Sequence, residues 1–64
     1  MKELDIVKSI KKISDKIDEN CQGVIVMVLT IPSLAYLIEF FDENENTIDI
    51  IPVNPEDIEL ICSS

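Results

Sequence analysis

The sequence of 64 residues contains no histidine, no arginine and no tryptophan, and it has only one glycine. Histidine is the side chain that enzymes use most often for general acid–base catalysis. The five serines have no base nearby in a recognisable nucleophile motif. Carboxylate pairs are plentiful, but so short a chain can hardly build the deep cleft that paired carboxylates would need. The composition therefore predicts a protein that is not an enzyme and needs no cofactor.

Long hydrophobic runs are also missing. The longest run, Val24 to Leu29, has six residues, whereas a membrane-spanning helix needs about 20. The first residues include acids and no apolar secretory segment, so we expect a cytoplasmic protein without a membrane partner. The two cysteines, Cys21 and Cys62, could pair with each other, but free thiols are the more common state in that compartment. No histidine or second cysteine pair accompanies them, so no metal site is expected.

Positive charge is confined to one end of the chain. All five lysines lie within the first sixteen residues. From Ile17 onward there are ten acids and no base, and the net charge of the whole chain is −8. A negative field repels nucleic-acid phosphates and attracts basic surfaces. Two interpretations stay open: the acids keep a small domain in solution, or they direct it to a basic protein partner. Nucleic-acid binding through the lysines is the least favoured function.

The chain is rich in isoleucine and valine, whose β-branched side chains favour strands. Apolar runs of strand length occupy residues 24–29, 35–41, 47–53 and 58–61. Side chains alternate along a strand, so the second run places Tyr36, Ile38 and Phe40 together on a core face. Residues 42–46 form a polar turn. Pro52 lacks a ladder donor, which predicts an edge or a bulge at the end of its strand, and Asn54 followed by Pro55 indicates one short helical turn.

The first segment has two interpretations. Ile6, Ile10, Ile13 and Ile17 recur at helical spacing, which would give an α+β fold with an N-terminal helix packed on a three- to four-stranded antiparallel sheet. Isoleucine is a mediocre helix former, however, and residues 4–7 also begin like a strand. The second interpretation gives a mostly β fold, a small SH3-like barrel of about five strands with one helical turn near Pro55.

The chain resembles a family of small bacterial domains, domain of unknown function 4926. The resemblance is carried in order by Leu4-Asp5 with Val7, Gly23-Val24-Ile25-Val26 with Val28-Leu29, Ala35-Tyr36, Ile38-Glu39-Phe40, Asp42-Glu43-Asn44, Thr47, Val53 and Pro55-Glu56-Asp57-Ile58. It implies an SH3-like barrel, in which the first segment is a short strand followed by an irregular loop. It brings no known catalytic residue and no accepted activity, and the free-standing character of such proteins is compatible with immunity or antitoxin roles.

The chain departs from the pattern of this family at three positions. Glu45 stands where relatives usually have glycine, which favours a turn of four or five residues over a tighter one. Met27 and Leu37 stand where relatives usually have polar residues, and alternation turns both away from the core face together with Phe41. Either the barrel curls enough to cover these side chains, or they form an exposed apolar patch of the kind that marks an interface.

These observations predict a partner-binding site and a function. The site combines the apolar patch with acids on the same strands and turn, and its predicted members are Met27, Leu37, Phe41, Glu39, Asp42, Glu43, Glu45 and Asp49. The turn lacks the spacing and the glycine of an EF-hand, so it is predicted to be solvated and to hold no metal. The predicted function is an acidic protein-interaction module, an immunity or antitoxin-like inhibitor of a basic protein, with a homo-oligomeric structural protein as the alternative.

Overall fold

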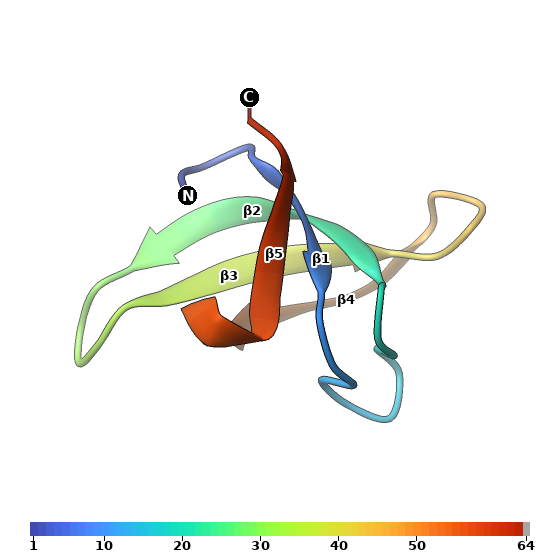
Figure 1. Ribbon diagram of the computed structural model, residues 1–64, viewed down its shortest axis with the longest axis horizontal. Coiled ribbons are helices and arrows are strands. Elements are labelled where there is room, and N and C mark those ends of the chain that lie inside the picture. The colour runs from blue at the N-terminus through green and yellow to red at the C-terminus, as the bar shows by residue number, and fades with distance from the viewer. Residues whose placement is uncertain (64) are drawn as a thin grey trace.

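The structure, a computed structural model, describes residues 1–63 and is built mainly from strands (Figure 1). Along the chain lie β1 (Ile6–Ser9), β2 (Gln22–Leu29), β3 (Ala35–Phe41), β4 (Thr47–Val53), the 3-10 helix η1 (Pro55–Asp57) and β5 (Ile58–Cys62). The strands form one antiparallel sheet in the order β4-β3-β2-β1-β5. In Figure 1, β5 crosses in front of β2 and β3, so the sheet curls over on itself. The predicted mostly β fold is confirmed, and the order of the elements is compatible with an SH3-like barrel.

The alternative with an N-terminal helix is wrong, because residues 6–9 form β1 and the part of the chain that is described contains no α-helix. The isoleucines at helical spacing do not share a buried face. Ile17 is fully buried, whereas Ile6 is 41% exposed and Ile10 is 45% exposed. β1 pairs with β2 on one side and with β5 on the other, so tertiary pairing overrides the local spacing. Within residues 1–63 no helix is long and apolar enough to span a membrane.

Ser9 holds the irregular loop that connects β1 to β2. Its side chain is fully buried, and its Oγ donates to the Asp18 carbonyl at 2.6 Å while accepting from the Cys21 amide at 3.0 Å. The backbone of Ser9 adds a donated bond to the Cys21 carbonyl and an accepted bond from the Asn20 amide. The loop also inserts Ile17 into the core. Four hydrogen bonds to one buried residue therefore define the path of a loop that has no regular structure.

The core lies between the curled parts of the sheet and consists of aliphatic and aromatic side chains. Its buried members are Val7, Ile17, Ile25, Tyr36, Ile38, Phe40, Val53 and Ile58. The predicted core face of β3 is confirmed, since Ile38 and Phe40 are fully buried and Tyr36 is 5% exposed. Burial of one large aliphatic or aromatic side chain contributes roughly 1.5–3 kcal/mol, so this row of β3 is a major source of stability for so small a domain.

Two irregularities in the pairing change the side chains that face the core. The register between β2 and β3 shifts after Ile25, so Val26 has no partner and Met27 pairs with Leu37. Val28, and not Met27, then packs against the core. A similar shift between β3 and β4 leaves Ile48 without a partner, and Ile48 also packs against the core. A bulge reverses the alternation of a strand beyond it, which no count along the sequence reveals.

Gly23 allows β2 to approach β3 closely. A Cβ atom built on Gly23 would lie 2.6 Å from the Cγ2 atom of Ile38 and 2.9 Å from the carbonyl oxygen of Glu39. Both distances are shorter than ordinary van der Waals contacts. The single glycine of the chain thus stands where the two central strands leave no room for a side chain.

The turn between β3 and β4 is the polar segment 42–46, as predicted, and it projects from the sheet (Figure 1). The carboxylate of Asp42 accepts from the amides of Asn44 at 2.8 Å and Asn46 at 2.9 Å through the same Oδ1 atom. Glu45, which stands at the position of the family glycine, has a φ of 65°, in the left-handed region that glycine favours. A residue with a side chain is strained in this region. The hydrogen bonds from the amides of Asn44 and Asn46 to Asp42 compensate for part of the strain at Glu45.

The two prolines near the end of the chain occupy the positions expected of them. Pro52 lies in β4, which is an edge strand, so its missing amide donor removes no bond from the interior of the sheet. Pro55 opens the single turn η1. Asn54 precedes it, but its side chain makes no capping hydrogen bond. Instead its carbonyl accepts from the Asp57 amide at 3.0 Å.

Candidate protein-interaction face

The side of the sheet that faces away from the core carries a continuous apolar surface, which we call the outer face. Its members come from four strands and are Ile6, Val24, Met27, Leu37, Glu39, Phe41, Ile50 and Pro52. Leu37 pairs with Met27 of β2 on one side and with Pro52 of β4 on the other. Side chains of directly paired residues lie next to each other on the same face of a sheet. The three form one apolar row, in which Met27 is 48% exposed and Leu37 is half-buried.

A second row crosses the outer face two residues further along β3. Glu39 pairs with Val24 of β2 and with Ile50 of β4, and Val24 in turn pairs with Ile6 of β1. Ile50 is 49% exposed and Ile6 is 41% exposed. The Glu39 carboxylate accepts from the Thr47 hydroxyl at 2.6 Å. One acid therefore stands between apolar residues of both neighbouring strands.

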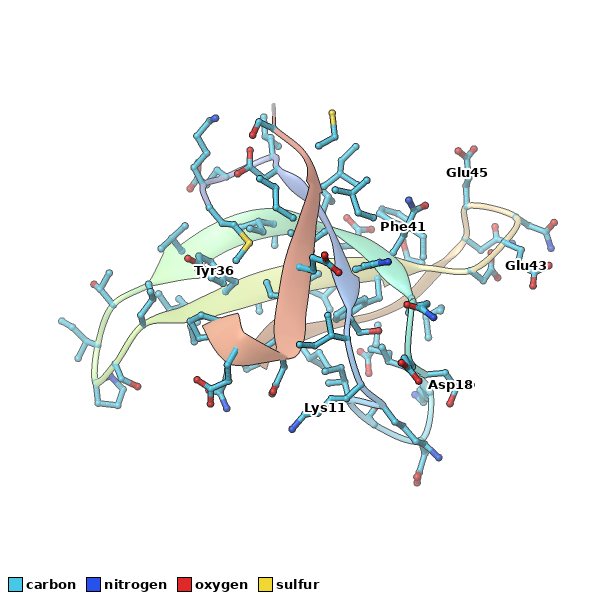
Figure 2. All side chains as sticks on the ribbon, in the orientation of Figure 1. Lys11, Asp18, Tyr36, Phe41, Glu43 and Glu45 are labelled. Atoms are coloured by element: carbon cyan, nitrogen blue, oxygen red, sulfur yellow. The ribbon has the colours of Figure 1, made fainter. Side chains whose placement is uncertain are left out.

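The outer face ends at the turn, where three of the predicted residues come together. We call Asp42, Glu43 and Glu45 the hairpin acids. With Phe41 they line a shallow hollow of about 610 Å³, whose other walls are Leu4, Ile6, Gln22, Gly23 and Val24. Figure 2 shows Glu43 and Glu45 on the projecting hairpin and Phe41 nearer the sheet. The hollow thus joins an apolar floor to an acidic rim.

A second hollow of about 640 Å³ lies against the same turn, on the side of the loop between β1 and β2. Asp18 and Glu19 line it together with Asp42 and Glu43, and Lys8 and Lys16 are also among its walls.

Cys21 also lines this hollow. Its burial, and to a smaller degree the negative charges of Asp18 and Asp42, raise the pKa of its thiol above the ordinary range. Cys21 is therefore a neutral thiol at pH 7, and its Sγ donates to the Phe41 carbonyl at 3.5 Å.

Asp49 does not belong with the other predicted site residues. It pairs with Phe40, which is fully buried, and paired side chains share one face. Asp49 therefore lies on the side of β4 that faces the core, at the margin of the sheet. Its carboxylate accepts from the Ile50 amide at 2.9 Å. Within β4, Asp49 shares the face of Ile51 and Val53, which pair with the buried residues Ile38 and Tyr36. Strand alternation therefore gives this position once the buried face of β4 is known.

Three of the five lysines form ion pairs with acids other than the hairpin acids. Lys2, Lys8 and Lys11 lie within 4 Å of Asp5, Glu59 and Asp57, respectively. Among residues 1–63 no ion pair involves Glu39 or a hairpin acid. Lys11 lies well apart from Glu43 and Glu45 in Figure 2. Lys8 and Lys16 line the second hollow beside Asp42 and Glu43, but in the described part of the chain neither forms an ion pair with a hairpin acid.

Several residues of the site were missed by the sequence reasoning. Val24, Ile50, Pro52 and Ile6 belong to the outer face, and Asp18 and Glu19 add charge beside the hairpin acids. Pairing each strand with its neighbour in register would have found Val24 and Ile50. The approach of Asp18 depends on the Ser9 hydrogen bonds and has no local signal. Within residues 1–63 no group of three His, Cys, Asp or Glu side chains is disposed to hold a metal ion.

Fold and site together define a small antiparallel β domain whose sheet exposes an apolar face bordered by acids. Comparison with known families identifies the chain more closely. It belongs to the family described as Domain of unknown function (DUF4926), whose model matches residues 3–60. No curated protein matches the chain. No solved structure matches it either.

Proposed function

We propose that the chain is a non-catalytic, acidic interaction module that binds a basic protein through its outer face. The observation that supports this function is the continuity between the exposed apolar rows and the hairpin acids. Exposed apolar patches of this kind mark protein interfaces. Unpaired acids beside such a patch steer a partner of opposite charge toward it and raise the rate of association.

The two parts of the site have different roles in this proposal. The hairpin acids lie on a projecting turn, so their field reaches solvent with little screening by the rest of the chain. Their contribution weakens as salt is added, because exposed charges are screened over about 10 Å at 0.1 M ionic strength. Met27, Leu37 and Ile50 are excluded from water on binding and contribute in proportion to the apolar area that they bury. The complex is thus expected to form quickly and to depend on both charge and apolar contact.

An immunity or antitoxin-like inhibitor is the form of this function that we propose. The substrate cleft of a nuclease is basic because it binds phosphates, and an acidic protein that covers the cleft would compete with the nucleic acid. The negative field opposes binding of nucleic acid by the chain itself. Cys21 and Cys62 are both free, which is compatible with action in the cytoplasm of a bacterium.

The test uses the chain as bait and variants that separate charge from apolar contact. Met27→Glu/Leu37→Glu alters the apolar row, and Glu43→Gln/Glu45→Gln neutralises two hairpin acids. Asp15→Asn/Glu56→Gln is the matched control, because it removes the same charge from exposed residues outside the outer face. A protein that the wild type retains is purified, and its affinity for each variant is measured by calorimetry at low and high salt.

We expect a basic protein that binds the wild type and the control variant equally. Glu43→Gln/Glu45→Gln should weaken binding mainly at low salt, and Met27→Glu/Leu37→Glu should abolish it at both. Inhibition of the purified partner's nuclease activity by the wild type would support the inhibitor form. A partner that binds all variants equally would contradict the proposed site. A wild-type chain that associates only with further copies of itself would instead support a homo-oligomeric structural protein.

A further inference from the structure

We infer that Glu39 prevents the outer face from pairing with a second copy of the chain and selects a protein partner that brings a lysine or arginine to this position. The inference rests on the proposed function, since it specifies the chemistry of the surface that the outer face accepts. It commits to one occupant: a partner surface with a cationic side chain set among apolar residues. A second copy of the chain is the occupant that it excludes.

The position of Glu39 gives it this influence. It lies in β3 between Val24 and Ile50, with Leu37 and Phe41 two residues away along the same strand and face. Any surface that covers Leu37 and Ile50 must therefore also cover Glu39. Burial of a carboxylate without a cationic partner is strongly unfavourable, because the lost hydration is not replaced. The Thr47 hydroxyl supplies one hydrogen bond to Oε2, but a neutral donor does not compensate the charge.

Symmetry makes a second copy a poor partner for this surface. Homodimers are usually two-fold symmetric, so a residue near the centre of the interface faces the same residue of the other copy. Glu39 would then face Glu39. Like charges across an interface disfavour a complex strongly, and strands use charged residues within an apolar face to prevent unwanted association. The outer face is thus apolar enough to bind a protein and has a charge that makes self-pairing unfavourable.

The chain carries few cations that could relieve this repulsion. No base occurs from Ile17 onward, so β2, β3 and β4 offer none. Lys8 of β1 is the nearest candidate in the sheet, two residues from Ile6 on the same strand. Its Nζ already lies 3.9 Å from Glu59 of β5. The complementary cation must therefore come from a different protein, in keeping with the charge of the chain as a whole.

The test measures self-association by sedimentation equilibrium and needs no knowledge of the natural partner. The wild type is expected to remain monomeric. Glu39→Leu should dimerise at least about 100-fold more tightly than the wild type, because the unpaired charge is removed from the apolar face. Glu39→Lys should also be monomeric alone. An equal mixture of wild type and Glu39→Lys should form a heterodimer, because each outer face then meets the opposite charge.

Two control variants make the result specific. Met27→Glu added to Glu39→Leu should abolish the dimer, which shows that association uses the outer face. Lys8→Gln added to Glu39→Leu should leave the dimer equally tight, which shows that Lys8 takes no part in the association. Circular dichroism verifies that each variant is folded. A wild type that dimerises as tightly as Glu39→Leu, or a mixture that stays monomeric, would overturn the inference.

This result is separable from the outcome for the proposed function. If Glu39→Leu dimerises but no basic partner depends on the hairpin acids, the role of Glu39 stands and the proposed partner is wrong. If a basic partner binds through the outer face but Glu39→Gln binds it as tightly as the wild type, the proposed function stands and the selection by Glu39 is wrong.

Discussion

The two faces of β3 differ in burial and in charge, although their residues alternate along a single strand. Tyr36, Ile38 and Phe40 are buried and hold the curled sheet together. On the other face, Leu37 and Phe41 are half-buried and Glu39 separates them. Both faces are rich in apolar side chains, so composition does not distinguish them. A charge at the centre of one face shows which of the two remains open to solvent and to partners.

The largest expected effect distinguishes neighbouring aromatic residues on opposite faces. Phe40→Ala should lower the free energy of unfolding by about 3–5 kcal/mol, because it removes a fully buried ring and leaves a cavity. That loss approaches the whole stability of a small domain. Phe41→Ala, the matched change on the outer face, should cost less than about 1.5 kcal/mol. Urea unfolding followed by circular dichroism measures both values, and equal losses would show that the two faces do not differ as described.

A smaller effect is expected at the contact between β2 and β3. Gly23→Ala places a methyl group within 3 Å of Ile38 and of the Glu39 carbonyl, so it should destabilise the domain by about 1–3 kcal/mol through overpacking. Thermal unfolding of this variant provides the measurement. A variant as stable as the wild type would mean that β2 and β3 can separate at this position at no cost.

Cys21 allows a test of the charge around the turn. Its thiol pKa is raised in the folded chain by burial and by the nearby carboxylates of Asp18 and Asp42. The neutral thiol therefore favours the folded state, and this contribution is present below the thiol pKa of the unfolded chain and lost as pH rises through the folded pKa. In a Cys62→Ser background, the pH profile of alkylation should lie at higher pH for the folded chain than for the same chain in urea.

Substitution of the acids provides the control for that profile. Asp18→Asn and Asp42→Asn should each move the alkylation profile toward lower pH, because each removes a negative charge that disfavours the thiolate. The shift from burial should remain. Coincident profiles for the folded and unfolded chains would contradict the position of Cys21 between the loop and the turn.

Those parts of the fold that depend on a local pattern of residues could be predicted from the sequence. Alternation along residues 35–41 predicted the buried row of β3, and the polar turn and Pro55 marked the ends of strands. The helical spacing of the isoleucines was misleading because β1 gains partners on both sides, which are distant in the sequence. The bulge beside Val26 and the one at Ile48 depend on pairing between strands, and they turn Val28 and Ile48 toward the core. Asp49 was assigned to the wrong face because the sequence did not show which face of β4 is buried.

The candidate site was predictable to a similar degree. Met27, Leu37 and Glu45 were found because they differ from the polar or glycine residues expected at these positions. Phe41 followed from strand alternation, and Asp42 and Glu43 followed from their charge beside the same strand. The central position of Glu39 became evident only from the register, which places Val24 and Ile50 on either side of it. Charge and hydropathy along a chain indicate that an interface exists. The arrangement of its residues depends on pairing between strands.

The most direct test of the difference between the two faces is the stability of Met27→Glu/Leu37→Glu. Both substitutions place an acid on the outer face, where surface changes usually alter stability by less than about 0.5 kcal/mol each. The double variant should therefore unfold in urea at nearly the same midpoint and with the same cooperativity as the wild type. Loss of the folded state would show that Met27 and Leu37 belong to the core, and that the outer face is not free to bind a partner.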